Sequence, residues 1–91
     1  MNETQKAVVT VIGKDMVGIL SKVSAAVADA NANVLEMTQS ILDGYFCLIM
    51  ILDITKSDKT IEELREIIGG RVPDMVVHVM HENIFDAMHR I

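Results

Sequence analysis

The chain opens with a run of mostly β-branched residues that a helical pattern follows. Residues 6–12 predict a strand, and Gly13 begins the turn after it. Asp15 stands at the N-cap of a helix expected over about 16–32, whose apolar stripe comprises Leu20, Val23, Val27 and Ala30. Asn31 and Asn33 end this helix, because short polar side chains tolerate the left-handed conformation at a helix exit.

Two further strands, over 34–42 and 45–54, flank Asp43-Gly44, the favoured pair for a two-residue type I′ turn. A turn of this length fixes the register, and one face then pairs Leu42 with Tyr45, Ser40 with Cys47, Thr38 with Ile49 and Glu36 with Ile51. The other face is apolar except for Gln39, and we expect it to lie under the helices; its apolar members are Leu35, Met37, Ile41, Phe46, Leu48, Met50 and Leu52.

The last third of the chain predicts a helix, a strand and a tail. Thr60 and Glu63 have the spacing of a capping box, and Gly69-Gly70 together with Pro73 marks the expected end of the second helix. Residues 75–81 predict a fourth strand. Asn83 is expected to cap a short tail helix over 83–91, whose apolar side comprises Ile84, Phe85, Met88 and Ile91.

The order βαββαβ predicts one fold class. Short connections and right-handed crossovers favour a ferredoxin-like α+β sandwich, in which an antiparallel four-stranded sheet of order 4-1-3-2 carries two helices on one face. The third strand is almost continuously apolar and suits a central position, whereas Glu36, Thr38 and Ser40 suit an edge. We expect one domain over 1–91, with a core of about 6–82 and a tail of 83–91.

The opposite face of this sheet lacks a cover. It would carry Leu42, Tyr45, Cys47, Ile49 and Ile51, with either Ala7, Val9 and Val11 or Val8 and Ile12 from the first strand. Monomers seldom leave a large contiguous apolar surface exposed, so we expect a homodimer. The alternative is a monomer in which the tail helix folds back over this face.

Composition excludes several kinds of partner. The chain has 91 residues, of which 51% are hydrophobic and 23% charged, which excludes intrinsic disorder. Its net charge of −5 has the wrong sign for neutralising nucleic-acid phosphates or anionic lipid, so we expect no nucleic-acid or membrane partner. The apolar run 45–52 is too short to span a membrane, and no signal-peptide pattern opens the chain. With a single cysteine, Cys47, these features predict a cytoplasmic location.

The motifs for the enzymatic and metal-binding chemistries of this fold are incomplete. Gly13 and Gly18 have P-loop spacing, but Ile19 stands where that motif requires lysine. The first loop lacks the two thiols of a copper chaperone and the arginine of an acylphosphatase. His78 and His81 are expected on opposite faces of a strand, where they cannot chelate one ion. Around the junction of this strand with the tail, His81, Glu82, Asp86 and His89 could approach one another, but they form no tight ligand motif, and a solvated polar junction is favoured over a metal site. We therefore predict no catalytic residues, no metal and no cofactor, and a protein that is not an enzyme.

The turn before the first helix is the remaining candidate site. Gly18 falls in the opening turn of the predicted helix, where glycine costs up to about 1 kcal/mol relative to alanine. Free N–H groups and the positive end of the helix dipole would receive a carboxylate there, and Asp15 would hold an ammonium group. An amino acid fits both. In the alternative, Gly18 only permits close packing and Asp15 only caps the helix; the residues alone do not choose between the two.

These residues resemble an ACT domain over about 6–82. The segment Gly-Lys-Asp-Met-Val-Gly-Ile-Leu at 13–20 is similar to the family signature Asp/Asn-x-x-Gly-Ile/Leu/Val, and Asn33-Val34 opens the second strand as in the family. The start of the chain over 6–15 and its ending over 81–91 are also similar to standalone prokaryotic ACT proteins of the UPF0237 type.

The resemblance implies a regulatory, ligand-sensing module. ACT domains typically pair, and small effectors, often amino acids, bind between the first loop of one subunit and the second strand of its neighbour. By position, the resemblance assigns ligand binding to Asp15, Met16, Val17, Gly18, Ile19 and Asn33. Two departures bear on ligand identity: many relatives carry Arg-Pro in place of Met16-Val17, and serine-binding relatives carry histidine in place of Gly13.

Two hypotheses about function follow. The first is a non-catalytic, amino-acid-responsive regulatory homodimer that acts on a regulated protein partner. The second is an interaction module without a small ligand, whose sheet face and tail dock onto another protein.

Overall fold

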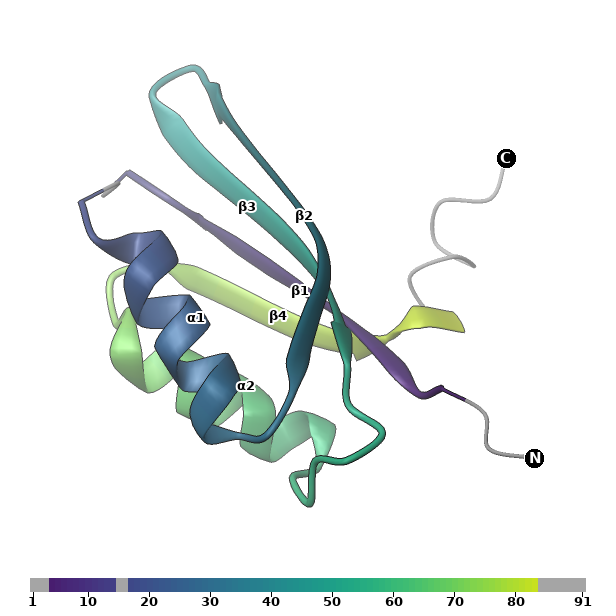
Figure 1. Ribbon diagram of the computed structural model, residues 1–91. Helices are drawn as coiled ribbons and strands as arrows, with labels where there is room; N and C mark the ends of the chain where they lie inside the picture. Colours follow the sequence, from purple (N-terminus) through teal and green to yellow (C-terminus); the bar gives the residue numbers. More distant parts are fainter. Residues whose placement is uncertain (1–3, 15–16, 84–91) are drawn as a thin grey trace.

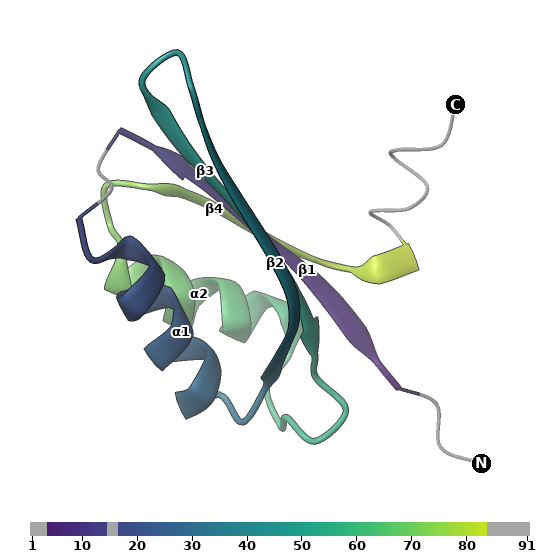
Figure 2. The same ribbon diagram turned by 45° about the horizontal axis from the view of Figure 1, so that its top comes forward.

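The computed structural model describes residues 4–14 and 17–83 and shows the expected order of elements (Figure 1). The elements are β1 Lys6–Gly13, α1 Ile19–Asp29, β2 Asn33–Leu42, β3 Tyr45–Asp53, α2 Ile61–Arg71 and β4 Val76–His81. The sheet has the order β2-β3-β1-β4, and all its neighbours are antiparallel. Both helices cover the same face of the sheet (Figure 2). The predicted ferredoxin-like fold is therefore confirmed.

The central strands β1 and β3 supply most of the core. Alternate residues of β1 point toward the helices, and this alternation resolves the open choice: Ala7, Val9 and Val11 belong to the core cluster, while Val8 and Ile12 face away. From β3, the core receives Phe46, Leu48, Met50 and Leu52. The predicted central position of β3 is confirmed by its place between β2 and β1.

The β2–β3 hairpin forms around the predicted turn. Asp43 and Gly44 both have positive φ, at 53° and 81°, as a type I′ turn requires. The predicted register holds from Leu42–Tyr45 to Glu36–Ile51. Beyond Glu36 it shifts, so Val34 rather than Leu35 pairs with Leu52. One extra residue, a bulge, was not visible in the apolar pattern.

Strand β2 is more exposed than the sequence predicted. Its apolar side chains were expected under the helices, but all ten residues of β2 are exposed. Only the β3 half of that face is buried. In Figure 1 the hairpin projects beyond the helices, which explains the exposure of Ile41, at 63%, near its tip. An edge strand with exposed apolar groups is thus a main surface feature of this molecule.

Helix α1 is shorter than predicted, and its N-cap is Gly18 rather than Asp15. The helix begins at Ile19 and ends at Asp29, and Asn31 follows with a φ of 59°. The prediction that asparagine adopts a left-handed conformation at the exit is confirmed for Asn31, whereas Asn33 already belongs to β2.

Helix α2 begins as predicted and ends within the predicted stop, after Gly70 and before Pro73. Thr60 and Glu63 form a reciprocal capping box, with Glu63 N–H donating to Thr60 Oγ1 at 3.1 Å and Thr60 N–H donating to Glu63 Oε1 at 2.8 Å. Gly69-Gly70 does not stop the helix, which continues to Arg71. Buried Leu64, Ile68 and Val72 hold this segment on the sheet, so packing outweighs glycine's low helix propensity. The predicted tail helix lies outside the described residues, except for its first position.

Candidate functional site

Gly18 occupies the turn between β1 and α1 in a conformation that favours glycine. Its φ of 71° and ψ of 4° are left-handed, and as a glycine it supplies no side-chain capping hydrogen bond. In the part of the chain that the structure describes, a Cβ at this position would have only the Lys22 Cε within 4 Å, at 3.8 Å. Gly18 is therefore needed for its backbone angle, and neither helix propensity nor close packing explains it.

Two lysines place positive charge near this turn. Lys22 lies one helical turn after Gly18, and its N–H donates to the Gly18 carbonyl at 3.0 Å. On the other side of the turn, the Lys14 ammonium lies 5.5 Å from the centre of the Tyr45 ring. An anionic group at the N-terminus of α1 would meet a favourable electrostatic field. Sequence reasoning had given neither lysine a role.

The other predicted residues of this loop differ in accessibility. Val17 is 83% exposed, whereas the Ile19 side chain is 2% exposed and belongs to the core cluster. Ile19 can therefore meet a ligand only through its backbone. Asp15 and Met16 lie outside the described residues.

Gly13, earlier in the same loop, is packed closely. A Cβ on Gly13 would collide with the Sδ of Met75, which precedes β4. Met75 is itself buried. A histidine at this position, as in serine-binding relatives, would have to displace Met75, so this part of the loop differs from the pattern of those proteins.

Asn33 lies far from Gly18 within the chain. The two residues flank α1, whose eleven residues span roughly 16 Å. Asn33 pairs with Asp53 at one end of β3, while Gly13, close to the Gly18 turn, pairs with Phe46 at the other. Of the predicted site residues that the structure describes, Gly18 and Asn33 therefore do not come together in one chain.

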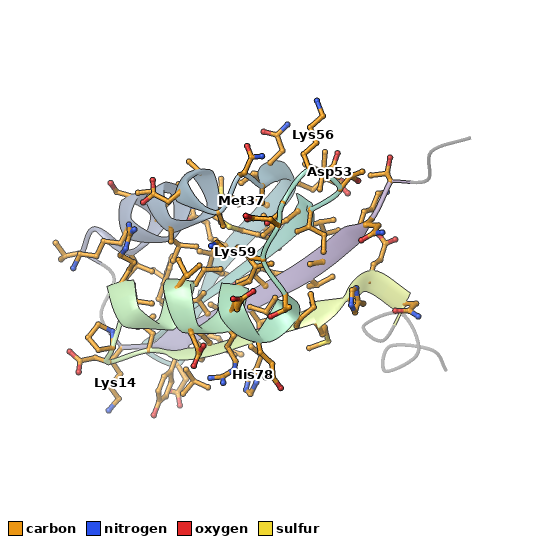
Figure 3. The ribbon with its side chains drawn as sticks, turned by 90° about the horizontal axis from the view of Figure 1, so that it is seen from below. Lys14, Met37, Asp53, Lys56, Lys59 and His78 are labelled. Carbon is orange, nitrogen blue, oxygen red and sulfur yellow. The ribbon has the colours of Figure 1, made fainter. Side chains whose placement is uncertain are left out.

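A cavity of about 340 Å³ lies beside Asn33. Its lining comes from the end of α1, the start of β2 and the loop after β3, and comprises Ala28, Asn31, Ala32, Asn33, Asp53 and Lys56. Figure 3 shows Asp53 and Lys56 near each other at this end of the molecule. Among the described residues, the Asn33 side chain makes no hydrogen bond and Lys56 makes no salt bridge, so both groups are available.

Hydrogen bonds fix the shape of this cavity. Asn31 Nδ2 donates to the Lys56 carbonyl at 2.9 Å, and Ser57 Oγ donates to the Ala30 carbonyl at 2.6 Å. These bonds tie the loop after β3 to the end of α1. The left-handed backbone of Asn31 is therefore part of the cavity wall, and the position of Lys56 depends on it.

Asp53 is held as a carboxylate. Hydrogen bonds from the side chain and the backbone N–H of Thr55 hold its pKa below the ordinary value. Desolvation alone would raise this pKa, whereas the charges of Lys56 and Lys6 lower it further. The Thr55 N–H donates to Asp53 Oδ1 at 2.9 Å, and Thr55 Oγ1 accepts from the Gln5 N–H at 2.8 Å. This chain of hydrogen bonds orients the carboxylate.

The sheet face opposite the helices is largely apolar. The register places Val8 between Ile51 and Met80, and Ile12 between Cys47 and Val76. Val8 is fully buried, although it belongs to no helix-side cluster, whereas Ile12, Tyr45 and Val76 are 40%, 41% and 57% exposed. The apolar face that the sequence predicted is therefore present.

The described residues include neither a cluster of metal ligands nor a membrane-spanning helix. Over 4–14 and 17–83, no group of three or more His, Cys, Asp or Glu side chains is placed to hold a metal ion. Asp86 and His89 lie outside this part of the chain. In the same residues, neither helix has the length and apolar character needed to cross a bilayer.

Comparisons with known proteins agree on the family. The family model described as ACT domain matches residues 5–81. A UPF0237 protein of Clostridium perfringens is 46% identical over 87 residues, covering 93% of this chain and 98% of that protein. A UPF0237 protein of Listeria monocytogenes is 42% identical over 88 residues, covering 94% and 99%.

Solved structures show the same fold. An ACT domain protein from Streptococcus pneumoniae has a TM-score of 0.71 and 28% identity, covering 96% of this chain and 100% of that one. A formyltetrahydrofolate deformylase from Pseudomonas syringae has a TM-score of 0.76 and 18% identity, covering 87% of this chain but 28% of the deformylase. The second likeness concerns the fold alone.

Proposed function

Because this chain belongs to the ACT domain family, we propose that it is a non-catalytic, cytoplasmic regulatory domain that binds an amino acid effector as a homodimer. The observation that carries this proposal is Gly18. Its left-handed backbone starts α1 at a residue that has no side chain to cap the helix, and among the described residues a Cβ there would have only the Lys22 Cε within 4 Å. Such a helix start favours a carboxylate, the group that every amino acid presents.

The separation of the site residues argues that two copies share each site. Gly18 and Asn33 flank α1 and do not meet in one chain. Strand β2 runs from Asn33 at one end of the sheet to Leu42 at the end where the Gly18 turn lies. Two copies joined antiparallel along β2 would bring Asn33 of one copy toward the Gly18 turn of the other. We assign the effector to this junction, with Asp15, Met16, Val17 and Ile19 of the loop around it.

The exposure of β2 supports this arrangement. A long exposed edge with apolar side chains readily pairs with another strand. Val34, Leu35, Met37, Ile41 and Leu42 are 40% to 71% exposed along this edge. A second β2 strand would cover them and satisfy the free backbone groups of the edge.

A second candidate function rests on the sheet face opposite the helices. Ile12, Tyr45 and Val76 form an exposed apolar surface on β1, β3 and β4. This surface lies away from the β2 edge, so it would remain available in the dimer described above. It suits docking of a regulated protein partner, with or without a small ligand.

A thermal-shift screen with the common amino acids tests the proposal. An effector at 100 times its Kd stabilises the folded state by about 2.7 kcal/mol, which raises Tm by roughly 10–20 °C in a domain of this size. Gly18→Val or Asp15→Ala should remove this shift and leave the circular dichroism spectrum unchanged. Gly69→Ala, a glycine in α2 with open space around it, is the matched control and should keep the shift. No shift with any amino acid would favour the interaction module.

A further inference from the structure

The cavity beside Asn33 contains two opposite charges that the family resemblance leaves without a role. Asp53 ends β3 and Lys56 follows in the loop, and both line the cavity. The cavity volume of about 340 Å³ falls within the range of small-molecule sites. Small side chains, Ala28 and Ala32, leave this space open at the end of α1.

The carboxylate is oriented before any ligand arrives, and the backbone that carries the lysine is fixed. Asp53 is oriented by Thr55, which in turn accepts a hydrogen bond from the Gln5 backbone. Lys56 is anchored through its carbonyl by Asn31, which fixes where its side chain begins. The Asp53 carboxylate therefore loses little conformational freedom when a ligand binds, whereas the Lys56 side chain is ordered by the ligand.

The combination of groups selects among ligand chemistries. A phosphate or other multiply charged anion would be repelled by the Asp53 carboxylate. A cation alone would be repelled by Lys56, and the described residues offer no cluster of metal ligands here. A molecule with both an ammonium and a carboxylate group satisfies both side chains, and the free amide of Asn33 can hydrogen-bond either end.

We propose that Asp53 binds the ammonium group and Lys56 the carboxylate group of the effector, so that the cavity beside Asn33 accepts zwitterions and rejects amino acid derivatives that lack either charge. This inference rests on the proposed function, because it concerns the same effector. It adds two residues to the site and a rule for its specificity. The Gly18 turn of the second copy then closes the cavity and adds its N–H groups to the carboxylate.

Isothermal titration calorimetry on the full chain tests this rule. Each common amino acid is titrated into the wild-type protein, and the one that binds is followed by its methyl ester and its N-acetyl derivative. Because hydrogen bonds to charged groups are strong, each derivative should bind at least about tenfold more weakly. Lys56→Gln and Asp53→Asn should each weaken binding of the unmodified amino acid by a similar factor.

Matched variants and derivatives separate direct contacts from general effects of charge. Lys59→Gln and Asp58→Asn change the same charges in the same loop outside the cavity, and they should change affinity by less than about twofold. Lys56→Gln should bind the methyl ester as well as the wild type does, because the ester already lacks the carboxylate that Lys56 would bind. Asp53→Asn should do the same with the N-acetyl derivative.

The outcomes distinguish this inference from the proposed function. Binding by the wild type, with Asp53→Asn and Lys56→Gln no weaker than their controls, would overturn the roles of these two residues and leave the regulatory function intact. Failure of every amino acid to bind the wild type would overturn both.

Discussion

The side chain of Met75 fills the space that a Cβ on Gly13 would need. The two residues come from the end of β1 and the turn before β4, which lie in adjacent strands of the sheet. This contact leaves no room for a side chain on Gly13, so packing between the end of β1 and the turn before β4 fills the Gly13 end of the first loop.

Gly13→Ala should destabilise the fold. The added methyl group must displace Met75 from a buried position, and overpacking of this kind costs about 1–3 kcal/mol. Urea unfolding monitored by circular dichroism measures the loss. The double variant Gly13→Ala, Met75→Ala should be less destabilised than the two single losses added together. Simple additivity would mean that the two side chains do not compete for this space.

Gly18→Ala should lower the free energy of unfolding by about 1–2 kcal/mol, because alanine is strained at the left-handed φ of this position. Gly18→Asn should cost less, since asparagine tolerates this conformation. Urea unfolding of the three proteins checks the order glycine, asparagine, alanine. Equal stability of the alanine variant and the wild type would contradict the positive φ of Gly18.

Acid should reduce the contribution of Asp53. Its pKa is lowered in the folded state, so Asp53 stabilises the fold above its unfolded pKa of about 3.9, and this stabilisation is lost as pH falls through the lower, folded value. The difference in stability between the wild type and Asp53→Asn should be largest at neutral pH and shrink below about pH 4. In a Thr55→Val background, the difference in stability between the protein with Asp53 and its Asp53→Asn variant should be smaller at neutral pH, because the Thr55 side chain no longer hydrogen-bonds the carboxylate. A difference that grows in acid would contradict the direction of this shift.

A substitution on β2 should show whether two copies pair along the β2 edge or through the sheet face opposite the helices. Met37→Lys adds a charge to the exposed edge strand and should shift the dimer toward monomer, whereas Glu66→Lys on α2 should not. Size-exclusion chromatography with light scattering gives the mass of each. If Met37→Lys remains dimeric and Ile51→Lys becomes monomeric, the copies pair through the sheet face opposite the helices instead.

Motifs whose residues lie within a few positions of each other predicted the structure well. The Asp43-Gly44 turn and the Thr60–Glu63 capping box depend on residues within a few positions of each other, and both form as predicted. The strand order followed from topology rules together with the apolar character of β3. Local propensity failed at Gly69-Gly70, where packing of α2 on the sheet continues the helix.

The cavity was missed because it depends on distant contacts. Asn31 and Lys56 are separated by 25 positions, and only their hydrogen bond brings the loop after β3 against the end of α1. The register of the hairpin would place Asn33 opposite Ile54, and the bulge beyond Glu36 pairs it with Asp53 instead. The positive φ of Gly18 could not be predicted from the apolar pattern either, because that pattern reports burial and carries no information on backbone angles.

A mixing experiment tests most directly whether two copies share each effector site. Gly18→Val and Asn33→Ala each damage one side of the junction, so neither protein alone should bind the effector. When the two are unfolded together and refolded as an equal mixture, half the dimers are mixed and each contains one intact site. Calorimetry should then recover about one quarter of the wild-type sites at wild-type affinity. A mixture that binds no better than its components would contradict a shared site.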